Sequence, residues 1–469
     1  MLFDIGILQI TIVTLSYWYL GFLYGSGFLF LLYHVAENLL IALGYQPVPF
    51  VDIGMEFEKK DGTNNLVAYF EAESLDLDSV KKRIYEQGIS KIKNLRYVRS
   101  DILGLALFKI ATEEEAKLQI KRVNKEVKTD KEVIDYCSHL AQYKIDRSKP
   151  NWECHVQENY TKNTSLVFFV MQHGLIDAVG YASLMSCLLD NQFKLKMKKK
   201  FTPISFAWKV FYCVFALPYT SYMSFKYKMI KSDDGAEKVQ EQTDPNTLQK
   251  NCYSTVELDF SAVKKCYKRF KGVTFGDYFM GVVSKAFHDW YREQGIDNAN
   301  NIKAVVSVNN RDFPQGYDSL ILGTRIAVFE CHYPLLGNFE KAITESKKAF
   351  RSIYSEHGAQ LIELFFSIFK FFPKAAVRHL AEDMLGGIGC AISNVPFSEE
   401  QWIFCGKKVL KQGFWAHGSE HIGIFITPIT YGDKLRVNFT ANRTMKLSGQ
   451  KLVSQFEKVI NEDIAEGAK

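Results

Sequence analysis

The sequence predicts a mixed α/β protein of two related lobes, preceded by an apolar N-terminal segment. Residues 5–33 contain no charged side chain. A strand-then-helix pattern occurs at 66–88 and again at 254–272, with the polar stretch 231–250 between them. We therefore expect four parts, namely a membrane anchor at 1–48, an N-terminal lobe with a membrane-associated insertion at 49–230, a linker at 231–250 and a C-terminal lobe at 251–469.

The N-terminal apolar run is long enough to cross a bilayer, which takes about 20 residues. It forms either one membrane helix or a helical hairpin, because glycines interrupt it at Gly21, Gly25 and Gly27. A secretory signal fits less well, since no basic residue precedes the run. The apolar stretches 201–225 and 361–380 are either interfacial membrane helices or buried helices of the core.

Charge and cysteine usage narrow the class of protein. The net charge of +6 is modest. The sequence contains no long basic tail of the kind that would indicate a nucleic-acid partner. The lysine cluster at 194–200 either binds an anionic group, from lipid or from a co-substrate, or forms a solvated loop. The nine cysteines lack paired spacing, which predicts free thiols in a reducing compartment. No third ligand accompanies His417 and His421, so we expect no metal site.

Each lobe is expected to contain a strand followed by a helix that starts at an aspartate. In the first lobe the strand 66–73 precedes a helix beginning at Asp76. The same strand-then-helix pattern occurs again at Asp259. The run Ser165–Met171 is apolar throughout and predicts a strand buried on both faces. Strands in the second lobe are expected at 301–308, 319–330, 388–395, 421–431 and 434–442, and helices at 276–295 and 448–464.

A histidine stands where the buried strand ends. His173 is followed by a short turn, and Asp177 lies four residues later, close enough to brace the loop or pair with an arginine. A neutral imidazole has a pKa near 6.5 and can accept a proton from a hydroxyl at neutral pH. The residues alone leave a structural histidine and a catalytic one both open.

Several motifs together resemble one family of enzymes. The stretch "QHGLIDAVG" (172–180) is similar to the HHxxxDG signature of CoA-dependent acyltransferases with the chloramphenicol-acetyltransferase-like fold. Further stretches, in the same order along the chain, resemble elements of the wax ester synthase/diacylglycerol acyltransferase family: 273–295, 306–312, 393–396 and 422–443. The resemblance covers roughly residues 65–460, and the ordered set is more specific than any single motif.

The resemblance implies a fold and a set of roles. Two chloramphenicol-acetyltransferase-like lobes with mixed sheets would bind acyl-CoA as co-substrate, with no other cofactor and no metal. His173 would be the general base and Asp177 its brace. The residues that support the motif are Gln172, Gly174, Gly180 and Asp277. The candidates for oxyanion binding or tunnel lining are Ser393, Asn394, Asn309 and Arg311.

Three positions depart from the family pattern. The first histidine of the signature is Gln172, the asparagine of the TxND motif is Gly276, and Phe397 follows Val-Pro in place of Gly-Pro. The reading as an enzyme predicts a membrane-bound O-acyltransferase that acts on a long-chain alcohol or diacylglycerol. The alternative is a catalytically degenerate structural subunit with partners in a membrane complex.

The expected location follows from the substrates. Fatty acyl-CoA and lipid alcohols partition into bilayers, so we expect the endoplasmic reticulum membrane or a lipid droplet. A mitochondrial membrane is the second candidate, although the sequence has no Arg-rich transit peptide.

Overall fold

The structure is a computed structural model of the 469-residue chain. It describes residues 32, 35–36, 38–48, 64–102, 105–191, 193, 205–211, 250–309, 311, 317, 320, 322–354, 388–395, 397–417, 422–442 and 447–467. The lysine cluster 194–200 and the apolar stretch 361–380 lie outside these residues, as do nearly all of the N-terminal apolar run, most of 201–225 and the linker up to residue 249. The predictions made for these segments therefore stay predictions.

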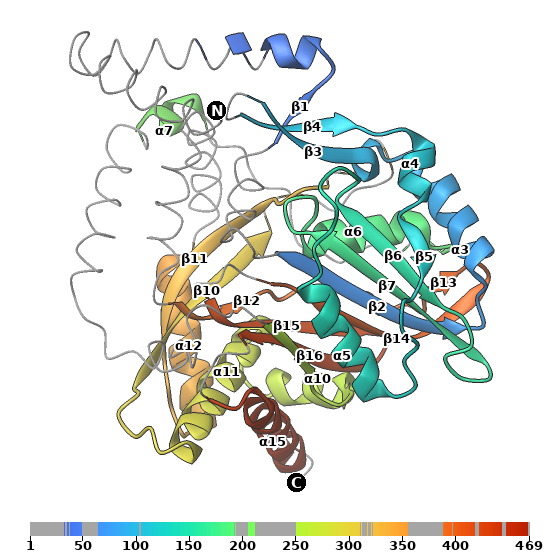
Figure 1. Cartoon of the computed structure of the whole chain (residues 1–469). Helices are drawn as coiled ribbons and strands as arrows, with labels where there is room; N and C mark the ends of the chain where they lie inside the picture. Colours follow the sequence, from blue (N-terminus) through green and yellow to red (C-terminus); the bar gives the residue numbers. More distant parts are fainter. Residues whose placement is uncertain are drawn as a thin grey trace.

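The first sheet is mixed and contains strands from both ends of the chain (Figure 1). In spatial order its strands are β13 (Ile403–Phe404), β14 (Lys407–Trp415), β2 (Asn65–Glu73), β7 (Thr164–Gln172), β6 (Trp152–Gln157) and β5 (Ile120–Arg122). Only the β5–β6 pair is parallel. The helices of this lobe are α3 (Leu77–Ile84), α4 (Glu113–Lys117), α5 (Asp130–Ala141), α6 (Ala178–Leu188) and α7 (Phe206–Phe211).

Strand β7 is buried on both faces, which confirms the prediction from its apolar run. Alternate side chains point to opposite sides of a strand. Accordingly, Phe169 joins the core cluster that contains α3 and α6, whereas Phe168 joins the cluster that contains α5. The sheet is thus covered by helices on both faces, and the chain leaves it at Gln172 already deep inside the protein.

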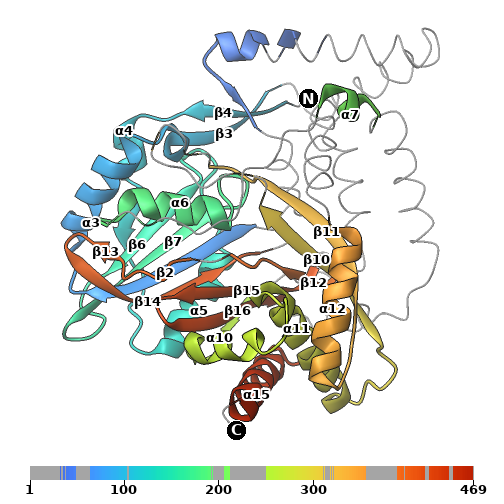
Figure 2. The same ribbon diagram turned by 180° about the vertical axis from the view of Figure 1, so that it is seen from behind.

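The second sheet is also mixed, with a parallel centre formed by β10, β12 and β15. Its strands are, in spatial order, β11 (Ile326–Pro334), β10 (Asn301–Asn309), β12 (Ile388–Ile392), β15 (Ile422–Tyr431), β16 (Lys434–Asn442) and β8 (Lys250–Ser254), and β9 (Leu258–Asp259) also pairs with β16. The helices of this lobe are α10 (Phe260–Lys268), α11 (Phe275–Glu293), α12 (Phe339–Ile353) and α15 (Gly449–Gly467) (Figure 2).

The two lobes begin their first helices in the same way. Asp76 caps α3 by accepting a hydrogen bond from the Ser79 backbone N–H at 2.8 Å. Asp259 caps α10 by accepting one from the Ala262 N–H at 3.0 Å. A carboxylate at this position satisfies one of the free N–H groups of the first turn. The repeated aspartate in the sequence therefore marks equivalent helix starts.

One hydrophobic core joins the lobes. Along β12 and β15, Ala391 and Phe425 face the cluster that contains α6 of the first lobe, whereas Cys390 and Ile424 face the helices of the second. The second sheet therefore packs its helices on one side and the first lobe on the other. The shared core fixes the end of β7 relative to the second lobe.

A small sheet lies at the N-terminal end of the described chain. It consists of β1 (Gln46–Pro47), β4 (Leu105–Ile110) and β3 (Tyr97–Ile102), in that order. Within the described residues, no helix combines the length and apolar character that crossing a membrane requires. Of the predicted anchor at 1–48, the uncharged run 5–33 falls outside these residues apart from Leu32, whereas residues 35–36 and 38–48 are described.

Two sequence-based expectations need correction or refinement. The strand expected at 319–330 is wrong in its first half, because β11 starts at Ile326 and the preceding residues contact the His173 loop. Strands β13 and β14 fall in the range assigned to the C-terminal lobe but hydrogen-bond within the first sheet. The division into domains at 231–250 stays a prediction. The eight described cysteines are free, as their spacing predicted.

Candidate active site

His173 occupies the first position after β7 and is held through its backbone. Its N–H donates to the Asn64 carbonyl at 2.8 Å, and its own carbonyl accepts from the Thr324 hydroxyl at 3.1 Å and the Ile176 N–H at 3.3 Å. The residue is only 5% exposed. Two segments far from it in sequence, together with its own loop, thus fix this one residue, since Asn64 precedes β2 and Thr324 precedes β11.

A hydroxyl group lies beside the imidazole. Thr324 Oγ1 lies 3.5 Å from His173 Nδ1, at the outer limit of a hydrogen bond. Thr324 follows Gly323, whose φ of +94° lets the chain turn toward the loop, where Gly323 bridges to Ile176. Thr324 was not among the predicted site residues, although a Gly-Thr pair inside an apolar run is a signal of such a turn.

Asp177 is buried and accepts from three donors. Its carboxylate caps α6 by accepting from the Gly180 N–H at 2.7 Å, pairs with the guanidinium of Arg311, and accepts from the Arg325 N–H at 3.0 Å. Arg311 also donates to the Gly323 carbonyl at 2.9 Å. These contacts connect α6 of the first lobe to the segment between β10 and β11 of the second. The carboxylate therefore holds the loop. None of these three contacts involves the imidazole of His173.

The glycines of the motif lie where space is short. A Cβ on Gly180 would come within 2.9 Å of Ile176 Cγ1 and 3.7 Å of Arg311 Nη2. Gly174 is buried in the turn itself. Gln172 is the last ladder residue of β7, and its N–H donates to the Asn151 carbonyl at 3.0 Å. The absence of a side chain at Gly180 therefore allows the Asp177–Arg311 pair to approach the helix.

The candidates in the second lobe form another group. Ser393 and Asn394 follow β12, and the Ser393 N–H donates to the Ile426 carbonyl at 3.0 Å. Asn394 Nδ2 would lie 3.5 Å from a Cβ on Gly276, so this amide lies at the start of α11. Asp277 closes a capping box there by accepting from the N–H and the hydroxyl of Thr274, both at 3.0 Å. The retained aspartate thus stabilises the helix start.

The remaining candidates have structural contacts. The Asn309 side-chain amide donates to the carbonyl of Arg311, which lies two residues further. Phe397, which departs from the family pattern, is buried with its ring 6.0 Å from Tyr181 of α6 and 5.7 Å from Phe414 of β14. Among the described residues, no three His, Cys, Asp or Glu side chains are grouped so that they could hold a metal ion.

Comparison with known proteins identifies the family. Residues 121–203 match the wax ester synthase/diacylglycerol acyltransferase catalytic domain, and residues 326–462 match the WS/DGAT C-terminal domain. No curated protein matches the chain.

Solved structures share the fold at low sequence identity. The wax ester synthase/diacylglycerol acyltransferase of Marinobacter aquaeolei VT8 is 12% identical with a TM-score of 0.59, covering 90% of this chain and 100% of that one. A trichothecene 15-O-acetyltransferase of Fusarium sporotrichioides is 13% identical with a TM-score of 0.61, and 90% and 94% are covered. The starter condensation domain of rhizomide synthetase, as a mutant with C8-CoA and Leu-SNAC, is 12% identical with a TM-score of 0.59, and 92% and 96% are covered.

Both matched regions contribute to the site. The first contains the His173 loop, and the second contains β12, β15 and β16. The chain belongs to the wax ester synthase/diacylglycerol acyltransferase family of acyl-CoA-dependent acyltransferases.

Proposed function

We propose that this protein transfers a fatty acyl group from acyl-CoA to the hydroxyl of a long-chain alcohol or diacylglycerol, with His173 as the general base. The observation that carries the proposal is the placement of His173 inside the matched catalytic domain, buried at the junction of the two lobes. A base must be held at a fixed position for proton transfer to be efficient. The three backbone contacts of His173 provide that rigidity.

The Thr324 contact suggests which ring nitrogen accepts the proton. A threonine hydroxyl has a single proton, and this one points to the His173 carbonyl. The same oxygen can then only accept from Nδ1. This favours the tautomer with the proton on Nδ1, in which Nε2 carries the basic lone pair.

The proposed reaction is a direct transfer. Nε2 takes the proton of the acceptor hydroxyl as its oxygen attacks the thioester carbonyl. The C–S bond then breaks, and the imidazolium returns the proton to the leaving thiolate of CoA. Ser393 and Asn394 are the candidates for hydrogen bonding to the oxyanion, a type of contact that typically contributes a few kcal/mol. Asp177 contributes by holding the loop.

A membrane location is part of the proposal. Large apolar side chains are exposed in and next to the helical residues 38–42, and in α7. Both segments lie at the end of the molecule that carries β1 (Figures 1 and 2). They are Leu32, Val35, Leu39, Ile41, Leu43, Trp208 and Phe211. Apolar surface of this kind favours a lipid interface. We place the protein at the endoplasmic reticulum or lipid droplets, with mitochondrial membranes as the second candidate.

The proposal is tested by acyl-CoA turnover in microsomes that contain the full-length chain. Products formed from a long-chain alcohol and from diacylglycerol are measured for wild type and for His173→Ala. Removal of a general base should lower turnover by about 10²- to 10⁴-fold. The control is His332→Ala, at a half-exposed position on β11, which should leave turnover unchanged. Equal activity of wild type and His173→Ala would overturn the assignment of His173 as the general base. Turnover no higher than in microsomes without the chain, for both proteins, would favour a structural subunit.

A further inference from the structure

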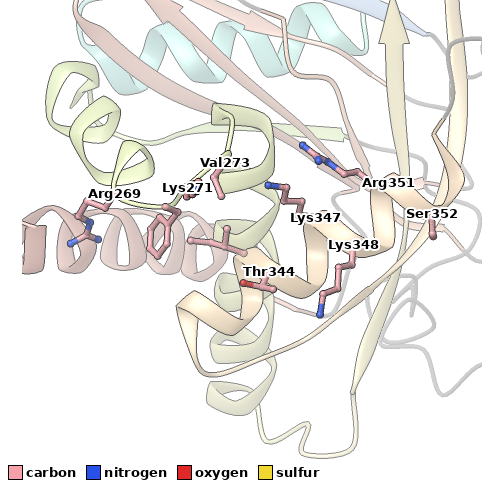
Figure 3. Close-up of a pocket in the computed structure, with 10 residues that line it drawn as sticks. Arg269, Lys271, Val273, Thr344, Lys347, Lys348, Arg351 and Ser352 are labelled. Atoms are coloured by element: carbon pink, nitrogen blue, oxygen red, sulfur yellow. The ribbon is translucent and has the colours of Figure 1, made fainter.

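A basic pocket lies in the second lobe, apart from the residues around His173. It has a volume of about 780 Å³ and is formed by the turn after α10 and one side of α12 (Figure 3). Five cationic side chains line it, namely Arg269, Lys271, Lys347, Lys348 and Arg351, and the lining contains no carboxylate.

The periodicity of α12 brings three of the cations together. Residues three or four apart lie on the same side of a helix, so Lys347, Lys348 and Arg351 face the pocket together with Thr344. The opposite side of the helix buries Ala342 and Ser346. The cations are therefore gathered by the same packing that anchors the helix.

The turn after α10 supplies the facing wall. Gly272 has a φ of +68°, a conformation that glycine adopts without strain, and this reverses the chain between Lys271 and Val273. The Lys347 ammonium donates to the Gly272 carbonyl at 2.6 Å and so ties the turn to α12. Phe270, Val273 and Ile343 add apolar surface.

The C-terminal helix holds one of the cations in place. Asp463 of α15 pairs with Arg269 and accepts from the Tyr278 hydroxyl at 3.0 Å. Burial, followed by the Asp463 charge, raises the pKa of Tyr278, so its hydroxyl stays protonated and keeps donating. Cys266 lies next to this group, and burial raises its pKa to about 11, so it remains a thiol.

The pocket retains positive charge after its ion pairs are counted. Asp463 contacts Arg269, Asp277 lies 3.6 Å from Arg351, and Glu345 lies 2.7 Å from Lys348 on the exposed side of α12. Five cations against three carboxylates leave an excess of two positive charges. Gathering like charges around a cavity is unfavourable, and a bound anion would offset that cost.

We propose that this pocket binds the phosphate groups of an organic phosphate ester. Guanidinium and ammonium groups form strong charge-assisted hydrogen bonds with phosphate oxygens, and the apolar wall suits the organic part of such a ligand. Resting on the proposed function, the ligand is the phosphorylated end of CoA. An anionic phospholipid headgroup has the same phosphate chemistry, and the experiment separates the two sources.

The experiment measures binding of the intact chain in detergent. The test variant is Lys271→Glu/Lys348→Glu. The matched control, Lys268→Glu/Lys341→Glu, changes exposed lysines of α10 and α12 that do not line the pocket. Calorimetry gives the Kd for CoA, 3′-dephospho-CoA and pantetheine. Sedimentation measures binding to vesicles of pure phosphatidylcholine and of phosphatidylcholine with phosphatidylserine. Equal unfolding midpoints show that both variants are folded.

We expect the test variant to bind CoA roughly 10- to 100-fold more weakly than the control, because at least one charge-assisted contact is lost. Its binding of pantetheine should be unchanged. If only the preference for phosphatidylserine vesicles is lost, the phosphate belongs to a lipid headgroup. If test and control variants bind every ligand alike, the pocket proposal is overturned. Binding needs no turnover, so CoA binding without acyl transfer would contradict the proposed function alone.

Discussion

Two buried charges hold the loop that carries His173. Asp177 and Arg311 are both almost completely buried. Asp177 also accepts from the Gly180 and Arg325 N–H groups, and Arg311 also donates to the Gly323 carbonyl. A buried ion pair adds little net stability by itself, but removing one partner leaves an uncompensated charge. The pair therefore matters most for the position of the loop.

We predict that Asp177→Ala lowers the free energy of unfolding by about 3–5 kcal/mol, because Arg311 is left buried without its carboxylate. Urea denaturation followed by far-UV circular dichroism measures this change. The double variant Asp177→Ala/Arg311→Met removes both charges and should recover part of the loss. A double variant that loses as much stability as the two single variants together would contradict the coupling.

The sequence predicted the residues of the His173 loop better than the residues that contact this loop. Asp177 was expected to brace the loop or meet an arginine because it is the fourth residue after His173. The identity of that arginine depends on a contact across 134 positions of the chain, which no local pattern specifies. Thr324 was missed for the same reason, since its partner His173 lies in the other lobe.

The contact between α11 and α12 depends on one glycine. A Cβ on Gly281 would lie 2.4 Å from Ile343 Cγ1, 2.9 Å from its Cα and 3.0 Å from its backbone N. Backbone atoms cannot rotate away as a flexible side chain can, so any side chain at this position must push the helices apart. Three cations of the basic pocket, Lys347, Lys348 and Arg351, are carried by α12, one of the two helices that would be pushed apart.

We predict that Gly281→Ala destabilises the protein by about 1–3 kcal/mol, the usual cost of overpacking. The control is Gly276→Ala in the same helix, where a Cβ meets only ordinary contacts at 3.5 and 3.7 Å. Since alanine favours helix over glycine by up to about 1 kcal/mol, the control should be neutral or slightly stabilised. Thermal unfolding of the two variants compares them directly. A Gly281→Ala protein as stable as the control would show that the helices can separate without cost.

Elements with a clear period were predicted closely, whereas irregular connections were not. The helix expected at 276–295 is α11, Phe275–Glu293, because a capping residue and an amphipathic pattern mark it. The strand expected at 319–330 starts later, at Ile326. Before it, the chain turns at Gly323, which bridges to Ile176 of the His173 loop. A tertiary contact overrides the local pattern there.

At the scale of the whole molecule, the described parts of the two lobes pack together, and the late part of the chain completes the early sheet. β14 pairs with β2 across more than 330 positions, and strands of both lobes share one core. Apolar alternation predicts a strand at such a place but not which sheet it joins. This is why the sequence indicated two lobes without indicating that β13 and β14 join the first sheet.

The shared core predicts cooperative unfolding. Phe414 of β14 is 1% exposed and its ring lies 5.3 Å from that of Tyr181, on the helix that follows the His173 loop. Phe414→Ala should cost about 3–5 kcal/mol, as large-to-small changes in a core do. Because the core is continuous, hydrogen exchange should speed up in β7 and in β10 by similar factors. The control Leu410→Ala changes a 45% exposed side chain of the same strand and should leave both rates unchanged. Faster exchange in β7 alone would mean that the lobes open independently, and the core shared between them would then not couple their stability.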